Sequence, residues 1–185
     1  MKREYTQKIT TAINFFWNTK KKQGSVLAGK QLDAFLNLLK GVAMEEGVPE
    51  SCIYLKNNHI PGYYRATKDW DMVIVSPQNN LVAAIELKSQ VGSYGNNLNN
   101  RVEETLKVKV NEPHFMVRPE FKDTTYLDRY RILCQRLVLE HKYNAVALLA
   151  TQGKSHYESI ADNISIETFI NSFRGHLLGL TDEFK

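Results

Sequence analysis

The sequence predicts an α/β protein in which a mixed β-sheet is flanked by helices. Its first part carries apolar residues at helical spacing over residues 4–22 and 26–46. Two nearly continuous apolar runs follow, at residues 73–75 and 81–87, and such runs are typical of strands covered on both faces. A further helical pattern at residues 125–142 precedes another apolar run. Because helices, strands and again helices alternate along the chain, we expect helices packed on a shared sheet.

Two helices are predicted in the N-terminal part, each with one apolar face. The buried stripe of the first consists of Ile9, Ala12, Ile13, Phe16 and Trp17. The stripe of the second consists of Leu32, Phe35, Leu36, Leu39 and Val42. Gly47 and Pro49 follow the second stripe, so we expect this helix to end there.

The middle of the chain reads as strands joined by a turn. Residues 52–55 form a short apolar run and are a candidate strand. The two central strands are separated by residues 76–80, whose proline and asparagines are turn residues. We therefore expect a hairpin at the centre of the sheet.

The C-terminal part is predicted to contain a helix, a strand and a last helix. The helix at residues 125–142 should bury Leu127, Tyr130, Leu133, Cys134 and Leu137. Residues 144–151 form a continuous apolar run and are predicted to be a buried strand. Ser165 is expected to cap a last helix with the buried stripe Ile166, Phe169, Ile170, Phe173 and Leu177.

Composition indicates one globular domain of 185 residues, 43% hydrophobic and 24% charged. We expect a helical part at residues 1–48 and a catalytic sheet with flanking helices at 49–185. No apolar run approaches the roughly 20 residues that span a bilayer, and the N-terminus does not resemble a signal peptide. Cys52 and Cys134 lie far apart, so neither a zinc site nor a disulfide framework is indicated. We therefore expect a cytoplasmic protein with no membrane partner.

Charge and motif content narrow the function classes. The formal net charge is +4, which favours an anionic partner. The sequence contains neither of the glycine-rich phosphate-binding motifs, GxxxxGK[ST] and GxGxxG, so no nucleotide cofactor is expected. It also lacks the GxSxG motif of serine hydrolases and any paired histidines at metal-ligand spacing.

The candidate active site lies at one end of the central hairpin. Asp71 stands at the start of the first strand, and Glu86 and Lys88 stand at the end of the second. Since side chains alternate along a strand, Glu86 and Lys88 should point the same way and Leu87 the opposite way. Two carboxylates held close together need a compensating cation. A divalent metal is one solution, whereas an exposed ion pair between Glu86 and Lys88 is the plain structural alternative.

The spacing of these residues has the general form of the PD-(D/E)xK nuclease site, in which two acidic residues and a lysine lie at a sheet edge. In this pattern Asp71, Glu86 and the Leu87 carbonyl would hold Mg²⁺, and Lys88 would orient the attacking water. The glycine- and asparagine-rich segment that follows supplies side chains able to contact DNA. Among them are Asn96, Asn97, Asn99, Asn100 and Arg101.

Longer strings resemble the XhoI family of type II restriction endonucleases. They are GKQLDAFLNLL, GYYRATKDWDMVIV, LVAAIELKSQVGSYGNNLNNRVEE, KVNEPHFMVRPEF and YLDRYRILCQRLVLEHKYNAVALLAT. The resemblance implies a homodimeric, Mg²⁺-dependent enzyme of a bacterium or archaeon that cuts double-stranded DNA at a short palindrome, CTCGAG in this family. It also implies a PD-(D/E)xK restriction-endonuclease-like core and a companion methyltransferase. Residues 89–101 match the family's loop SQVGxxxGNNxNNR nearly in full, so the resemblance implies DNA contact by Ser89, Gln90, Ser93, Tyr94, Asn96, Asn97, Asn99, Asn100 and Arg101.

One departure from the family pattern follows Glu104. The family has a helix, a loop and a further strand between the NNRxEE motif and the segment that leads into EPHF, whereas here Glu104 is followed almost at once by residues 107–110. Either the sequence omits a loop, or the protein has lost these residues. The second case favours a DNA-binding relative inactivated by the deletion. A structure-specific repair nuclease that uses the same site is a further alternative.

Overall fold

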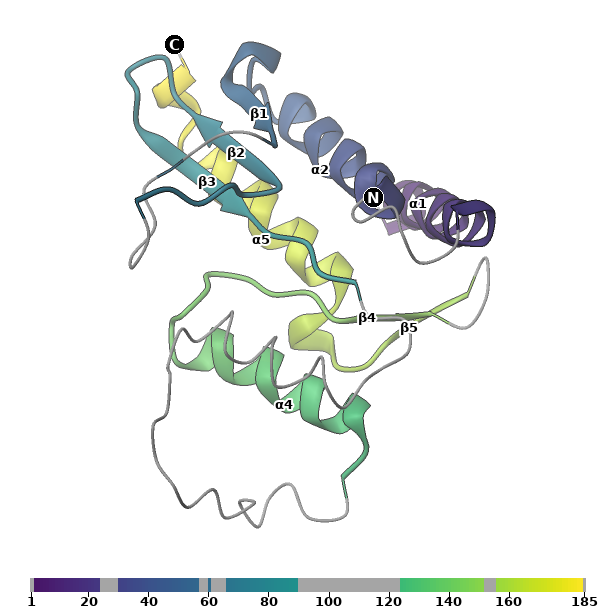
Figure 1. The fold of residues 1–185 in the computed structure, drawn as a ribbon. Helices are drawn as coiled ribbons and strands as arrows, with labels where there is room; N and C mark the ends of the chain where they lie inside the picture. Colours follow the sequence, from purple (N-terminus) through teal and green to yellow (C-terminus); the bar gives the residue numbers. More distant parts are fainter. Residues whose placement is uncertain are drawn as a thin grey trace. The chain divides into compact units, whose positions relative to one another are not determined.

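The computed structural model of the chain describes residues 2–23, 30–56, 60, 66–89, 124–151 and 156–184. Four helices and five strands lie in these ranges (Figure 1): α1 Lys2–Gln23, α2 Asp33–Glu45, β1 Ile53–Leu55, β2 Met72–Val75, β3 Leu81–Ile85, α4 Tyr126–Leu139, β4 Leu149–Thr151, β5 Tyr157–Ser159 and α5 Ile166–Leu178. Short 3-10 helices are η1 Lys30–Leu32, η2 Glu50–Cys52, η4 Asp162–Ile164 and η5 Thr181–Phe184.

The chain forms two compact units. The first comprises Met1–Lys88, Thr151–Glu158 and Ile170–Lys185, and the second comprises Ser89–Ala150 and Ser159–Phe169. The candidate catalytic residues Asp71, Glu86 and Lys88 all belong to the first unit. The single nuclease domain expected over residues 1–185 stays a prediction.

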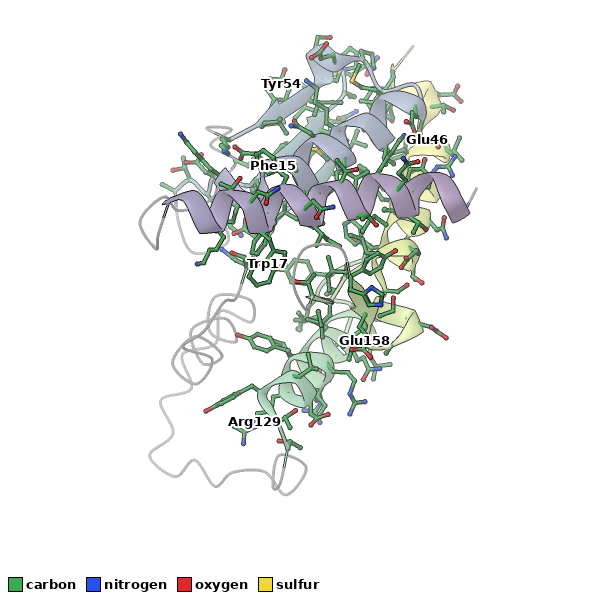
Figure 2. The ribbon with its side chains drawn as sticks, turned by 90° about the vertical axis from the view of Figure 1, so that its right-hand side faces the viewer. Phe15, Trp17, Glu46, Tyr54, Arg129 and Glu158 are labelled. Atoms are coloured by element: carbon green, nitrogen blue, oxygen red, sulfur yellow. The ribbon has the colours of Figure 1, made fainter. Side chains whose placement is uncertain are left out.

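Helix α1 confirms the predicted apolar face. Ile9, Ala12, Ile13 and Phe16 are buried, as expected from their spacing. The Trp17 indole N–H donates a 3.0 Å hydrogen bond to Thr151 Oγ1. Phe15 projects from the opposite side of α1 and is exposed (Figure 2).

Helix α2 differs from the prediction at its start and on its buried face. The described part of this region begins with η1, and α2 itself starts at Asp33; the predicted start at residue 26 lies outside the described residues. Leu32 and Phe35 are only partly buried. The buried face instead consists of Leu36, Leu38, Leu39, Val42 and Ala43. The helix ends as expected, because Gly47 adopts a positive φ of 90°, which glycine tolerates best.

The first unit contains an antiparallel sheet with the strand order β1-β2-β3. The middle strand β2 contributes core residues, since Met72, Val73 and Ile74 are almost completely buried. Two main-chain hydrogen bonds of 2.9 Å between Ser76 and residues 79 and 80 close the predicted turn. The described residues thus combine helices with an antiparallel sheet, which is consistent with the α/β class. A mixed sheet was predicted.

The third strand is shorter than predicted. β3 ends at Ile85, so Glu86, Leu87 and Lys88 lie just beyond the ladder and not within it. β3 is also less covered than expected, because Leu81 is exposed. The continuous apolar run therefore overstated both the length and the burial of this strand.

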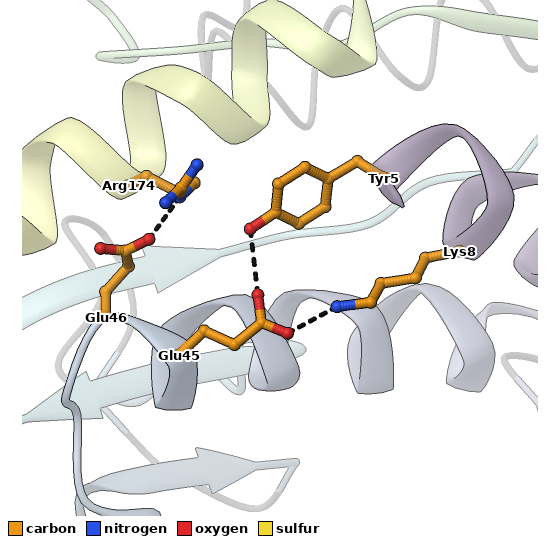
Figure 3. A network of polar contacts seen from close by, with 5 residues as sticks. All are labelled: Tyr5, Lys8, Glu45, Glu46 and Arg174. Carbon is orange, nitrogen blue, oxygen red and sulfur yellow. Dashed lines mark hydrogen bonds and ion pairs between the residues drawn. The ribbon is translucent and has the colours of Figure 1, made fainter. Parts of the chain in front are cut away.

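Side chains tie α1, α2 and the C-terminal part of α5 together (Figure 3). The Tyr5 hydroxyl donates a 3.0 Å hydrogen bond to Glu45 Oε2, and Lys8 Nζ lies 2.5 Å from Glu45 Oε1. Arg174 on α5 forms an ion pair with Glu46 at the end of α2. His176 Nε2 lies 2.8 Å from the Val82 carbonyl oxygen of β3. These contacts fix the helices that support the sheet.

The second unit confirms part of the C-terminal prediction. Thr125 and Asp128 form a capping box at the start of α4, and Cys134 and Leu137 are buried there. Leu127, however, is 44% exposed, contrary to its predicted place in the core. The Ser165 hydroxyl accepts a 3.0 Å hydrogen bond from the Thr168 N–H, so Ser165 caps α5 as predicted.

The strand predicted at residues 144–151 is wrong for most of its length. Only Leu149–Thr151 are strand, and they are half-buried. The N–H of Leu148 donates a 2.8 Å hydrogen bond to the Ile164 carbonyl, so its donor is satisfied outside a sheet ladder. β4 pairs with β5, which was not predicted. Among the helices in the described ranges, none has the length and apolar character needed to cross a bilayer.

Candidate active site

The hairpin brings Asp71 and the segment 86–88 together. Asp71 immediately precedes β2, and Glu86 immediately follows β3. Because Met72 pairs with Ile85, the residues just outside this pair face each other across the hairpin. The sequence prediction that Asp71 folds back beside Glu86 and Lys88 is therefore confirmed as geometry, and their catalytic roles stay predictions.

A direct hydrogen bond fixes Asp71. The main-chain N–H of Leu87 donates to Asp71 Oδ2 at 2.6 Å. Burial raises the pKa of the Asp71 carboxyl and the Leu87 N–H opposes that rise, while the charge of Glu86 raises the pKa further. Asp71 thus faces a second negative charge across the hairpin end, as expected for two carboxylates that share a cation.

Two lysines lie on either side of Glu86. Lys88 Nζ is 2.5 Å from Glu86 Oε1, and Lys68 Nζ is 3.6 Å from Glu86 Oε2. The Glu86 side chain is only 18% exposed. The plain alternative of an exposed ion pair therefore does not describe this carboxylate, because it is shielded from most of the solvent.

One carboxylate oxygen of Glu86 accepts no hydrogen bond from the described residues. Within the described residues, Glu86 Oε2 is buried and has no hydrogen-bond partner, since Lys68 at 3.6 Å is beyond hydrogen-bond distance. A buried acceptor of this kind is costly unless another group satisfies it. A divalent cation is one such group.

The donor atoms fit a hard cation. The Asp71 and Glu86 carboxylates and the Leu87 carbonyl are oxygen ligands, which Mg²⁺ prefers, and the remaining positions of such an ion are usually filled by water. The described ranges contain no cluster of three or more histidine, cysteine or acidic side chains. The site thus offers a cation two carboxylates and one carbonyl.

Two further lysines at this site were missed by sequence reasoning. Lys68 Nζ lies over the Trp70 ring, 3.6 Å from its centroid, in cation–π geometry. Lys56 Nζ pairs with Asp33 Oδ1 at 2.8 Å. The positive charge of Lys56 opposes part of the rise in the Asp71 pKa. Lys68 could have been found, because it stands two residues before an aromatic residue and three before Asp71. Lys56 carries no such signal, because the pairing of β1 with β2 brings it beside Asp71 and the sequence did not specify that pairing.

The predicted DNA-contact segment lies almost wholly outside the described residues. Of its members the structure describes Ser89 alone. Gln90, Ser93, Tyr94, Asn96, Asn97, Asn99, Asn100 and Arg101 belong to the part that is not described. Their contacts with DNA stay predictions.

A hairpin end that holds two carboxylates and several lysines is the kind of site found in metal-dependent enzymes that act on phosphate esters. The sequence model of the family described as "Restriction endonuclease XhoI" matches residues 18–108 and 105–161 of this chain. The chain belongs to this family of type II restriction endonucleases.

Characterised relatives agree with this assignment. The type II restriction enzyme BstVI of Geobacillus stearothermophilus is 36% identical over 202 residues, covering 84% of this chain and 90% of that enzyme. The type II restriction enzyme XhoI of Xanthomonas vasicola is 36% identical over 159 residues, covering 64% of each chain. The type II restriction enzyme AbrI of Azospirillum brasilense is 34% identical over 120 residues, covering 56% of this chain and 54% of that enzyme. No solved structure matches this chain.

The alignments also bear on the departure after Glu104. The family match is broken into two segments that meet at residues 105–108. In addition, 84% of 185 residues is about 155, whereas the BstVI alignment spans 202 positions, so about 47 positions have no counterpart here. Both observations agree with a segment of the relatives that this sequence lacks. The backbone path from Glu104 to Val110 lies outside the described residues.

Proposed function

We propose that this protein is a type II restriction endonuclease that uses Mg²⁺ to hydrolyse phosphodiester bonds of double-stranded DNA at a short palindrome, CTCGAG. The observation that supports the proposal is the geometry of the hairpin end. There Asp71 and Glu86 face each other, and Lys88 Nζ forms an ion pair of 2.5 Å with Glu86 Oε1. Family membership supplies the substrate class, and this geometry supplies the residues.

The chain's own groups divide the chemical work. Asp71 and Glu86, with the Leu87 carbonyl, would hold the cation. When bound, the cation neutralises charge that builds on the phosphate and acidifies the attacking water. Lys88 is 44% exposed and is thus open enough to reach a water or a phosphate oxygen. It orients the water and stabilises negative charge while the bond to the 3′ oxygen breaks, which leaves a 5′ phosphate.

Recognition is assigned to the segment after the hairpin and to a second copy of the chain. Asparagine and arginine make paired hydrogen bonds to adenine and guanine in the major groove, which supports Asn96, Asn97, Asn99, Asn100 and Arg101 as base contacts. A palindrome is matched by a two-fold dimer, which supports a homodimer. In this proposal, residues 1–185 act as one nuclease domain with a PD-(D/E)xK core.

A second candidate is a DNA-binding relative that has lost cleavage. The family match in two segments that meet at residues 105–108 supports it, because a segment lost there would divide the match in this way. The described site argues against it, since Asp71, Glu86 and Lys88 remain together. A structure-specific repair nuclease would use the same three residues without sequence selection.

One assay separates these three functions. Purified protein is incubated with Mg²⁺ and two plasmids that are identical except that one carries a single CTCGAG site and the other a scrambled site. Conversion of only the first plasmid to one linear product supports the restriction enzyme. Degradation of both plasmids supports the structure-specific nuclease. Absence of cutting together with a shift of the CTCGAG duplex in a binding gel supports the non-catalytic relative.

A further inference from the structure

Lys68 occupies a place in the site that the function above does not use. Its Nζ lies 3.6 Å from Glu86 Oε2, the same oxygen that lacks a hydrogen-bond partner within the described residues. Both side chains are only 18% exposed. The ammonium therefore lies on the side of the carboxylate that is buried, whereas Lys88 takes the more open side.

Trp70 holds Lys68 in this place. The Lys68 ammonium lies 3.6 Å from the centroid of the Trp70 ring, a close cation–π contact. A second contact anchors the backbone, because the N–H of Lys68 donates a 2.7 Å hydrogen bond to the Ile60 carbonyl. Fixing a lysine side chain costs rotational entropy, and the contact with Trp70 offsets part of that cost at a position beside Glu86.

The distance of 3.6 Å indicates what that purpose is. The separation is short enough for strong attraction in a shielded site, but too long for a hydrogen bond. Lys68 thus balances the charge of Glu86 without satisfying its oxygen. A cation that binds Oε2 would therefore meet an available acceptor and a nearby positive charge at once.

We infer that Lys68 is a positioning residue that competes with the divalent cation for Glu86 and so keeps the affinity for that cation low until a phosphate arrives. The inference rests on the cation site proposed above. A DNA phosphate brings negative charge that offsets the repulsion between the cation and Lys68. Lys68 thereby links occupancy of the cation site to the presence of substrate.

The sign of one measurement separates this role from a merely structural one. If Lys68 competes with the cation, removal of its charge strengthens cation binding. If Lys68 only holds Glu86 in place, removal of the side chain weakens cation binding because the carboxylate is less well ordered. The two roles therefore predict opposite shifts of the same dissociation constant.

The experiment measures Mn²⁺ binding to the full chain without DNA, by the electron paramagnetic resonance signal of free Mn²⁺. Lys68→Met keeps the length of the side chain and its packing on Trp70 but removes the charge. We expect the dissociation constant to fall on the order of tenfold, since a unit charge a few ångströms from a divalent ion is removed in a partly shielded site. Lys68→Gln provides a second uncharged variant, and Lys68→Arg should stay within about twofold of the original protein.

Lys40→Met is the matched control, because Lys40 also pairs with a glutamate, Glu50, at 2.6 Å but lies on α2. It should leave Mn²⁺ binding unchanged. In cleavage assays, Lys68→Met should reach its half-maximal rate at a lower Mg²⁺ concentration than the original protein. Thermal unfolding of each variant shows that it is folded.

The outcomes distinguish this inference from the proposed function. Unchanged or weaker Mn²⁺ binding in the folded Lys68→Met and Lys68→Gln variants overturns the role of Lys68 and leaves the nuclease proposal intact. Failure of the original protein and of both uncharged variants to bind Mn²⁺ overturns the role of Lys68, and failure to bind Mn²⁺ beyond what the CTCGAG duplex alone binds, when that duplex is added, overturns both. Tighter binding in both uncharged variants, with Lys68→Arg and Lys40→Met unchanged, supports the inference.

Discussion

The main-chain N–H of Leu87 donates a 2.6 Å hydrogen bond to Asp71 Oδ2. This bond joins the residue before β2 to the segment after β3, so the two acidic residues of the site are held by the backbone of the hairpin and not only by side-chain packing. Burial nevertheless opposes ionisation of Asp71, whose pKa is raised. The site thus keeps a carboxylate in an environment that is unfavourable for its charge, which is common where function sets the residue type.

Replacement of Asp71 by asparagine should stabilise the fold and abolish cleavage. Asparagine can still accept the Leu87 N–H, but it carries no charge that burial penalises. Because the carboxyl is only partly buried, we expect a gain of at most about 1 kcal/mol in the free energy of unfolding at pH 7. Urea unfolding with chelator present measures it.

The pH dependence checks the cause of this gain. The pKa of Asp71 is raised in the folded state, so ionisation of Asp71 lowers the free energy of unfolding of the original protein when the pH is above that pKa. This loss is absent below the pKa of the carboxyl in the unfolded chain, about 4. The advantage of Asp71→Asn should therefore shrink as the pH falls to that range. Asp128→Asn is the control of opposite sign, because hydrogen bonds from Thr125 lower the Asp128 pKa. A gain for Asp71→Asn that is constant with pH would contradict the assigned cause.

Replacement of Glu45 by glutamine should weaken the contact network between α1 and α2 (Figure 3). The Lys8 hydrogen bond lowers the Glu45 pKa, and the Tyr5 hydroxyl adds to this. A carboxyl whose pKa is lowered by folding adds stability at pH values above its pKa in the unfolded chain. This stability is lost as the pH falls through its pKa in the folded protein. Since these side chains are partly exposed, we expect a loss of about 0.5 kcal/mol at pH 7. Urea unfolding at pH 7 and below pH 4 tests it, and an equal loss at both values would be inconsistent with this account.

Replacement of Ser165 by alanine should destabilise the start of α5. The hydroxyl accepts from the Thr168 N–H at 3.0 Å, which satisfies a donor that the helix itself cannot. We expect a loss of about 1 kcal/mol in the free energy of unfolding. Ser165→Thr keeps the acceptor and should lose less, so an equal loss in both variants would point to packing and not to capping.

The thiol of Cys134 should be inert in the folded protein. Burial raises the pKa of this thiol to about 11, so little reactive thiolate forms near neutral pH. In a Cys52→Ser variant, which leaves Cys134 as the single thiol, we expect slow reaction with a chromogenic disulfide at pH 8 and full reaction in denaturant. Fast reaction without denaturant would show that the predicted burial on α4 is wrong.

Sequence reasoning succeeded where chemistry and geometry coincide. The turn residues at 76–80 and the apolar runs on both sides specify a hairpin, and a hairpin necessarily returns Asp71 toward Glu86. The Ser165 cap was predictable for a similar reason, because the hydroxyl and the N–H it accepts from are three residues apart. In both cases local sequence alone determines the contact.

Sequence reasoning failed where contacts with distant parts of the chain determine the structure and burial of a segment. A continuous apolar run such as residues 144–151 fits a strand or an irregular buried segment equally well, and the hydrogen bond from Leu148 to Ile164 decides between them. Leu127 lies on the expected face of its helix but is exposed, since no other part of the described chain covers it fully. The approach of Lys56 to Asp71 also depends on distant residues, because it follows from the pairing of β1 with β2.

Glu86 is the carboxylate on which cleavage should depend most strongly. The most direct measurement is the single-turnover rate at which the protein cuts a labelled duplex with one CTCGAG site in saturating Mg²⁺, for the original chain, Glu86→Gln and the control Glu50→Gln. We predict that Glu86→Gln lowers the rate on the order of 1,000-fold while the duplex is still bound, and that Glu50→Gln leaves it unchanged. A folded Glu86→Gln variant that cuts at the original rate would show that the Glu86 carboxylate has no part in cleavage.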